Sequence, residues 1–418
     1  MSGAQKRGFG TRVIHECQTP DLWESGTLPP IYQTASHRFD TAQELSNVFA
    51  GKQAGYIYMR LRNPTNDVLE RKIAALEGGV GAVATATGMA AVTVAVMAIA
   101  GAGDEIVSGN SLFMSTYVLF AKVLPRFGIT ARLVETTDLS QYEKAVTDKT
   151  KIVFVETIGN PKMDVPDIAE LASIAHRHRA ALVVDNTLAS PYLFRPIEHG
   201  ADIVVHSLTK YFNGHGSAVG GVIVDSGKFP WSFDKYPDFE FYAGKRPDAP
   251  FLDKVWREIH INFGTTLAPF HAFLTLIGLD TLALRMERHL ANTQKVAEYL
   301  AGHPKVRWVN YPGLPASPWH QVAKRQFEGK GYGGLLTFGL GTQEACFKFI
   351  ENLKLIYHLA NLGDSKTLAI HPYSSQYVSF TEEKRKELSI HADMVRVSVG
   401  IEDPEDIIAD LKQALAAV

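Results

Sequence analysis

A lysine set among hydroxyl groups and glycines is the first candidate for chemistry in the sequence ADIVVHSLTKYFNGHGSAVGG, residues 201–221. Ser207, Thr209 and Lys210 follow an apolar strand pattern, and open α/β sheets bind ligands at the carboxyl ends of their strands. The glycines that follow allow the backbone to approach a bound group closely. Hydroxyls beside a lysine suit a Schiff-base lysine that holds an aldehyde cofactor, with the hydroxyls binding its phosphate. For this motif alone, the alternative is a surface loop with an incidental lysine.

A carboxylate ends the apolar run that precedes the lysine strand. Residues 181–184 (ALVV) predict a buried strand, and Asp185 follows them directly. A carboxylate there can pair with a protonated pyridine nitrogen, which keeps pyridoxal phosphate electron-poor enough to stabilise a carbanion. An ordinary cap after a strand is the alternative. Together, VVDNT and HSLTK favour pyridoxal phosphate more strongly than either motif does alone.

Two other segments offer groups for a phosphate. Gly88 and Met89 open an alanine-rich helical pattern, whose first backbone N–H groups lie at the positive end of the helix dipole. Neither GGVGAVA nor GHGSAVG matches the G-x-G-x-x-G fingerprint, so a nicotinamide cofactor is not favoured. Tyr58 and Arg60 stand two apart in an extended segment and would project from the same side, where they could clamp one phosphate. A surface arm contact is the alternative for this pair.

Three residues are candidates for contacts with the cofactor ring or the substrate. Phe113 follows a strand pattern and can stack on a flat cofactor, or it can be a core phenylalanine. Asn160 ends another strand pattern and can offer its amide to a ligand, or it can be a turn residue before proline. Arg396 alternates with valines in MVRVSV, which suits bidentate capture of a carboxylate or a structural ion pair.

Composition excludes several function classes. The 418 residues are 46% hydrophobic and 21% charged, which indicates a globular chain with a sizeable core. The net charge of −2, without a basic block, gives no sign of nucleic acid or an anionic membrane. Residues 78–103 carry no charge, but they predict a strand, a turn and a buried helix rather than a membrane span. The two cysteines lie far apart in the sequence and do not have the spacing of metal ligands, which suits a reducing cytoplasm. No targeting segment is visible, which also favours a cytoplasmic location.

The elements that must position these residues follow an α/β pattern. Residues 1–62 predict an N-terminal arm that contacts a neighbouring subunit. Residues 63–264 alternate strands and helices, which predicts a large, mostly parallel sheet covered on both faces. Residues 265–418 predict a smaller α+β domain, with a long helix over 272–300 and a terminal helix over 405–417. The expected strands of the large domain are 82–86, 104–108, 129–134, 151–156, 181–185, 202–206 and 219–224. The aromatic segment 226–257 predicts a long ordered loop.

The chain resembles the Cys/Met-metabolism enzymes that depend on pyridoxal phosphate, and among them the O-acetylhomoserine sulfhydrylases. The resemblance covers nearly the whole length and rests on motifs in the family's order: YIYMRLRNPT, DVLERKIAALEGG, FVETIGNP, LVVDNT, HGADIVVHSLTKY, GHGSAVGGVIVD, LRMERH, WVNYPGLP and RVSVGIED. It implies the aspartate-aminotransferase-like fold, fold type I of the pyridoxal-phosphate enzymes.

The resemblance also implies roles for individual residues. Lys210 would carry pyridoxal 5′-phosphate covalently, and Asp185 would pair with the pyridinium nitrogen. The phosphate would be held by Gly88, Met89, Ser207 and Thr209, and by Tyr58 and Arg60 from a neighbouring subunit. Asn160, Thr367 and Arg396 correspond to positions around the substrate carboxylate. The family's active unit is a dimer, usually doubled to a homotetramer.

The sequence departs from the family at Phe113, where a tyrosine is common and is thought to stack on the ring and to help protonate the leaving group. Ser115 stands where methionine γ-lyases typically carry cysteine, and HPYSSQY replaces HPASTTH-like text. The expected reaction is γ-replacement on O-acetyl-L-homoserine by sulfide or a thiol, giving homocysteine or methionine and acetate. Methionine γ-lyase and cystathionine γ-synthase activities are the alternatives. The sequence leaves open whether the sulfur donor is free sulfide, methanethiol or a sulfur-carrier protein.

Overall fold

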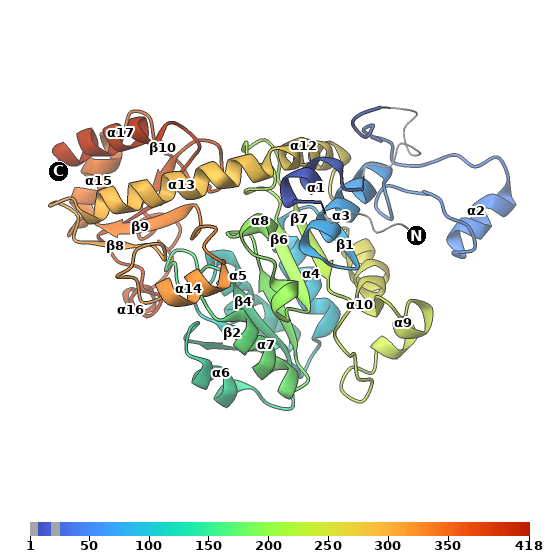
Figure 1. Cartoon of the computed structure of the whole chain (residues 1–418). Coiled ribbons are helices and arrows are strands. Elements are labelled where there is room, and N and C mark those ends of the chain that lie inside the picture. The colour runs from blue at the N-terminus through green and yellow to red at the C-terminus, as the bar shows by residue number, and fades with distance from the viewer. Residues whose placement is uncertain (1–6, 18–25) are drawn as a thin grey trace.

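The computed structural model describes residues 7–17 and 26–418, and a seven-stranded sheet forms its centre (Figure 1). The strand order is β1-β7-β6-β5-β4-β2-β3, and the pairs from β6 through β5, β4 and β2 to β3 are parallel. β7 runs antiparallel to both neighbours. The strands are β1 (Gly81–Thr85), β2 (Glu105–Gly109), β3 (Thr130–Val134), β4 (Thr150–Glu156), β5 (Ala181–Asp185), β6 (Ile203–Ser207) and β7 (Gly221–Asp225). Each lies within two residues of its expected position.

Apolar residues on both faces of these strands explain why helices cover both sides of the sheet. Val184 and Val204 belong to the core that includes α3 and α7, whereas Val183 and Val205 belong to the core that includes α4. The helices and helical turns of this part are α3 (Pro64–Glu77), α4 (Gly88–Ile99), α5 (Met114–Val118), η2 (Leu119–Val123), η3 (Leu124–Phe127), α6 (Leu139–Ala145), α7 (Ile168–Arg177), α8 (Ser190–Leu193) and η4 (Pro196–His199).

Local sequence sets the ends of the helices that frame the site. Asn63 caps α3 by accepting hydrogen bonds from Thr65 and Asn66, and Gly78 ends it in the left-handed conformation. Thr87 caps α4 through Ala90 N. The capped start of α4 therefore directs its first N–H groups toward the carboxyl edge of the sheet.

A second, five-stranded sheet has the order β10-β11-β12-β9-β8 and packs beneath α13, α15 and α17 (Figure 1). Its strands are β8 (Trp308–Asn310), β9 (Leu335–Gly339), β10 (Tyr357–His358), β11 (Leu368–Ile370) and β12 (Met394–Ser398). The helices are α12 (Pro269–Asp280), α13 (Leu282–Ala301), α14 (His320–Gln326), α15 (Gln343–Glu351), α16 (Glu382–Glu387) and α17 (Pro404–Ala416). The predicted helix over 272–300 is thus two helices, because Thr281 leaves the helical conformation between α12 and α13.

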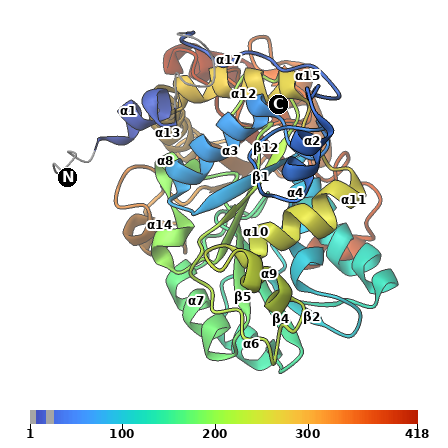
Figure 2. The same ribbon diagram turned by 90° about the vertical axis from the view of Figure 1, so that its right-hand side faces the viewer.

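Two segments are more structured than the sequence suggests. The predicted loop over 226–257 contains α9 (Phe239–Lys245) and α10 (Pro250–Lys254), continued by η5 (Val255–His260) and α11 (Ile261–Phe263). Phe229, Trp231, Tyr236, Phe239 and Phe251 form a buried cluster in which Trp231 stacks on Phe239, so packing orders the segment. The N-terminal arm contains α1 (Phe9–His15) and α2 (Ala42–Phe49), and α2 projects from the body of the molecule in Figure 1, on the side that faces the viewer in Figure 2. Across the described residues, no helix is long and apolar enough to cross a membrane.

Candidate active site

The carboxyl ends of β4, β5 and β6 bring together the groups that the sequence singles out. Strand register places Glu156 opposite Asp185, and Asp185 opposite Val205. Thr187 links the ends of β5 and β6. Its N–H donates to Asp185 Oδ1 at 2.9 Å, and its Oγ accepts from Ser207 N at 2.8 Å. Burial raises the pKa of Asp185, so a cationic partner at this position would stabilise its ionised form.

The start of α4 and the end of β6 form a close cradle. A Cβ on Gly88 would lie 2.7 Å from Ser207 Cβ and 3.1 Å from Ser207 Oγ, so only glycine fits there without a shift. Thr209 Oγ accepts from Gly220 N at 3.2 Å, which fixes a second hydroxyl on the same loop. Met89 follows Gly88 on the first turn of α4, and Thr116 Oγ donates to its sulfur at 3.6 Å. Backbone N–H groups and hydroxyls therefore converge in the arrangement that binds phosphate.

Lys210 is half-buried and lies in the turn that follows β6, three residues after Ser207. Its Nζ donates to Asn361 Oδ1 at 2.6 Å. Burial, followed by the nearby charge of Arg396, lowers the pKa of Lys210 to about 8. An amine with that pKa is partly uncharged near neutral pH and can act as a nucleophile or a base.

Arg396 presents a buried cation beside Lys210. It lies on β12 with 2% of its surface exposed, and its Nη1 donates to Asn160 Oδ1 at 3.0 Å. Its Nη2 donates to the backbone carbonyl of Asn361 at 3.4 Å. Within residues 7–17 and 26–418 no carboxylate forms an ion pair with Arg396, and burial lowers its pKa to about 10. An uncompensated buried guanidinium is suited to an incoming carboxylate.

Phe113 begins α5 at the same edge of the sheet, and a buried carboxyl holds its backbone. The N–H of Phe113 donates to Glu156 Oε1. Glu156 is 5% exposed, and burial, with Asp185 adding repulsion, raises its pKa well above the usual range. Both effects favour the protonated form of the Glu156 carboxyl.

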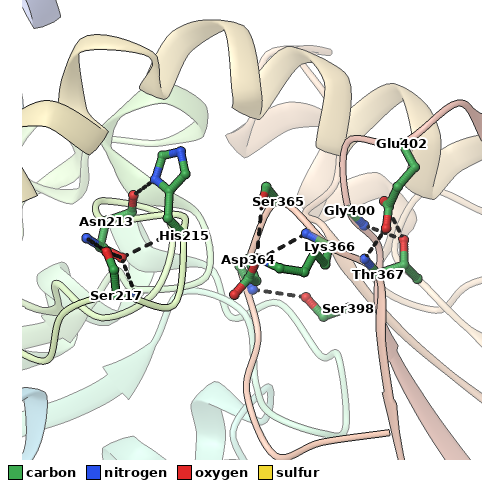
Figure 3. A network of polar contacts seen from close by, with 11 residues as sticks. Asn213, His215, Ser217, Asp364, Ser365, Lys366, Thr367, Ser398, Gly400 and Glu402 are labelled. Atoms are coloured by element: carbon green, nitrogen blue, oxygen red, sulfur yellow. Dashed lines mark hydrogen bonds and ion pairs between the residues drawn. The ribbon is translucent and has the colours of Figure 1, made fainter. Parts of the chain in front are cut away.

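Three of the predicted site residues lie in other surroundings. Thr367 is fully buried, and its Oγ donates to Glu402 Oε2 at 2.8 Å and accepts from Gly400 N at 2.9 Å (Figure 3). Tyr58 and Arg60 lie on the exposed arm, with the guanidinium 5.7 Å from the ring centroid. Arg60 also donates to the carbonyl of Ile261 at 2.6 Å. None of these contacts involves Lys210.

Sequence reasoning missed two residues that touch this site, Asn361 and Glu156. Asn361 contacts both Lys210 and Arg396. Glu156 anchors Phe113 beside Asp185. The position of Glu156 at the end of a predicted strand, next to the strand that ends in Asp185, could have indicated that it lies in the site. Asn361 follows no strand pattern, so no local pattern indicates its position.

The residues fit pyridoxal phosphate on grounds of geometry. Gly88 leaves the space that a Cβ would fill beside the Ser207 hydroxyl, where a phosphate can bind. Asp185 offers a carboxylate for a pyridinium nitrogen, and Lys210 offers an amine for the aldehyde. Across the described residues, no group of histidine, cysteine, aspartate and glutamate side chains has the arrangement of a metal site. The fold and the site are thus those of an enzyme in which a lysine binds an aldehyde cofactor at the edge of a mostly parallel sheet.

The chain belongs to the Cys/Met metabolism PLP-dependent enzymes, whose family model matches residues 10–416. It is 44% identical to O-acetyl-L-homoserine sulfhydrylase 1 of Thermus thermophilus, over 98% of this chain and 100% of that protein. It is 41% identical to the O-acetyl-L-homoserine sulfhydrylase of Leptospira meyeri, over 97% and 96% of the two chains. It is 43% identical to the homocysteine synthase of Schizosaccharomyces pombe, over 97% and 98%.

A solved structure extends the likeness to three dimensions. A Campylobacter jejuni protein named as a candidate O-acetylhomoserine (thiol)-lyase has a TM-score of 0.94 and 35% identity to this chain. The match covers 98% of this chain and 100% of that one, which contains N′-pyridoxyl-lysine-5′-monophosphate. The expected fold and the expected cofactor, pyridoxal phosphate, are both confirmed.

Proposed function

We propose that this chain catalyses γ-replacement on O-acetyl-L-homoserine, with sulfide or a thiol as the incoming group, to give homocysteine or methionine and acetate. The observation that carries the proposal is full-length similarity to relatives named for this substrate, across a site in which lysine, aspartate and arginine are all present. The choice between this reaction and a γ-lyase reaction depends on the side chains near the leaving group of the substrate.

Arg396 and Asn160 bind the α-carboxylate of the amino acid in this proposal. The guanidinium is buried, and its present partners are carbonyl oxygens, so a carboxylate supplies the charge that it lacks. Thr367 contributes indirectly, since its network with Glu402 fixes the chain that precedes β11. The substrate is therefore held at its carboxylate end.

Lys210 moves the protons. Pyridoxal phosphate, when bound, withdraws electrons from the α-carbon of the attached amino acid and so acidifies its α-proton. With a pKa of about 8, roughly a tenth of Lys210 is uncharged at pH 7 and can accept that proton. Ser207, Thr209 and the first turn of α4 would hold the phosphate of the cofactor, and Asp185 would pair with its ring nitrogen.

Phe113 favours an ester substrate over a thioether. Its ring gives an apolar face but no hydroxyl to protonate a leaving group. Acetate leaves as a carboxylate, whose conjugate acid has a pKa near ~4, whereas a thiolate has a conjugate acid near ~8.5 and needs more help from an acid. A γ-lyase acting on methionine or cystathionine would miss the hydroxyl more than a sulfhydrylase would.

We further propose that Tyr58 and Arg60 reach the phosphate of a neighbouring subunit in a homotetramer. Supporting this, both lie on the exposed N-terminal arm, where Arg60 packs over the Tyr58 ring and contacts α11. The unpaired state of Cys17 and Cys346 supports a reducing compartment such as the cytoplasm.

A product assay tests the proposed function. Purified enzyme loaded with pyridoxal phosphate is given O-acetylhomoserine and sulfide, and homocysteine and acetate are measured; in parallel, it is given methionine alone and 2-oxobutanoate is measured. The proposal expects homocysteine and acetate in equal amounts and little 2-oxobutanoate, with Lys210→Ala inactive in both assays. Faster release of 2-oxobutanoate from methionine would instead assign a γ-lyase. Replacing sulfide by cysteine tests for cystathionine formation.

A further inference from the structure

Asn361, in the segment between β10 and β11, contacts both Lys210 and Arg396. The side-chain oxygen of Asn361 accepts a hydrogen bond from Lys210 Nζ at 2.6 Å. Its backbone carbonyl accepts from Arg396 Nη2 at 3.4 Å. Asn361 thus joins the amine that moves protons to the guanidinium that faces a substrate carboxylate.

The segment that carries Asn361 is fixed against the lysine loop. We call residues 361–367 the strap. Ser365 N donates to the carbonyl of Gly214 at 2.8 Å, and Gly363 N donates to Ser398 Oγ at 2.9 Å. A Cβ on Gly363 would lie 2.9 Å from the backbone nitrogen of Tyr211, so the strap and the lysine loop are in direct contact.

Further contacts hold the far end of the strap. Thr367 N and Oγ donate to the two carboxylate oxygens of Glu402, at 2.6 and 2.8 Å, and Gly400 N donates to Thr367 Oγ (Figure 3). Figure 3 shows Asp364, Ser365 and Lys366 of the strap between this network and the loop that contains Asn213, His215 and Ser217. These bonds, together with that from Arg396 Nη2 to the carbonyl of Asn361, hold the strap beside the lysine loop.

We propose that Asn361 is a positioning residue that holds the freed Lys210 amine beside Arg396 whenever that amine is not joined to the cofactor. The proposal rests on the function assigned above, because only an enzyme that releases Lys210 during turnover needs such a resting place. A lysine side chain has four rotatable carbons and a flexible ammonium, so a fixed acceptor reduces the number of positions that it samples.

The chemistry of the amide adds a consequence for charge. The Asn361 oxygen only accepts hydrogen bonds, so it stabilises the ammonium form of Lys210 and offsets part of the cost of burial. Arg396 is the charged group that acts on Lys210 in the opposite direction. Removing the acceptor should lower the pKa of Lys210 below its present value of about 8, and placing a carboxylate there should raise it.

The experiment measures Lys210 itself, without turnover. Full-length enzyme is stripped of cofactor with hydroxylamine, labelled over a range of pH with an amine-reactive reagent, and the labelled fraction of the Lys210 peptide is read by mass spectrometry. For Asn361→Ala, we expect a pKa of Lys210 lower than that of the wild type by about one pKa unit. For Asn361→Asp, we expect a rise of roughly 1 to 3 pKa units, as for an opposite charge at contact distance.

The matched control is Ser365→Ala, which changes a strap side chain that contacts Asp364 and leaves the backbone bond to Gly214 in place. Its Lys210 titration should follow that of the wild type. The loaded Asn361→Ala enzyme should lose kcat at least tenfold while its KM for O-acetylhomoserine changes less, since Arg396 and Asn160 remain. The loss should be partly restored in Asn361→Gln.

The outcomes separate the two proposals. Unchanged Lys210 titration in both Asn361→Ala and Asn361→Asp would overturn the positioning role, whatever the activity of the protein. If the wild type failed to make homocysteine while the titration shifted as described, the proposed reaction would fall and the Lys210–Asn361 interaction would stand. Circular dichroism of each stripped variant verifies that it is folded, and Asn361→Ser replaces Asn361→Ala if the alanine variant is not.

Discussion

Replacing Gly88 by alanine should weaken cofactor binding without unfolding the protein. The new Cβ would lie 2.7 Å from Ser207 Cβ and 3.1 Å from Ser207 Oγ, well inside ordinary contact distance. Ser207 cannot simply retreat, because its backbone N–H is bonded to Thr187 Oγ at 2.8 Å. The hydroxyl that would bind the phosphate must therefore move.

The magnitude follows from the cost of overpacking, which is about 1–3 kcal/mol for an added methyl group in a well-packed site. Expressed as affinity, this cost corresponds to a cofactor Kd that is roughly 5- to 150-fold higher. Gly88 is the first residue of α4, so alanine there interrupts no hydrogen bond within the helix, and the stripped protein should remain folded.

The assay is titration of stripped enzyme with pyridoxal phosphate, followed by absorbance. Gly244→Ala is the matched control, because Gly244 also lies in a helix and its added Cβ would meet no atom within 4 Å. The control should bind the cofactor like the wild type. Equal cofactor affinity of the Gly88→Ala variant and the wild type would refute the assignment of this cradle to the phosphate.

The remaining predictions concern the substrate side of the site. Arg396→Ala should raise the KM for O-acetylhomoserine by at least tenfold, since charge-assisted hydrogen bonds contribute about 1.5–3 kcal/mol each, and Arg396→Lys should not restore it; an unchanged KM would place the carboxylate elsewhere. Glu156→Gln should be at least as stable as the wild type at neutral pH. The folded protein raises the pKa of Glu156, so the contribution of this carboxyl to stability is full below its unfolded pKa and falls as the pH rises. Glutamine does not ionise, so the variant should not show this fall in stability. Chemical denaturation at several pH values measures this, and a strongly destabilised Glu156→Gln variant would show that the carboxyl is ionised. Because the pKa of Lys210 is about 8, kcat should rise with pH from neutral and level off above about 8; a kcat that falls over that range would argue against Lys210 as the base.

The strands and most of the site could be predicted from the sequence, because each depends on local pattern. Most strands of the large sheet coincide with short apolar runs, and Asp185 and Ser207 lie at strand ends that a parallel sheet must bring to one edge. The proposed phosphate cradle follows in the same way from Gly88 at the start of a helix.

The contacts that were missed join segments far apart in the chain. Asn361 reaches Lys210 across 151 residues, and no periodicity indicates which polar side chain of LANLGDSKT points into the site. The helices in 226–257 depend on packing of Trp231 and its neighbours, and packing routinely overrides local propensity. The sequence placed Thr367 around the substrate carboxylate, but its bonds to Glu402 depend on a turn that no local pattern describes.

The central claim is that Lys210 carries the aldehyde cofactor and acts on the amino acid bound there. Borohydride reduction of the loaded enzyme, followed by proteolysis and peptide mass spectrometry, tests it most directly. The account predicts a single pyridoxyl-phosphate adduct, on the peptide that contains Lys210, which disappears when O-acetylhomoserine is added before reduction. An adduct on a different lysine, or an unmodified Lys210 peptide in fully loaded enzyme, would contradict it.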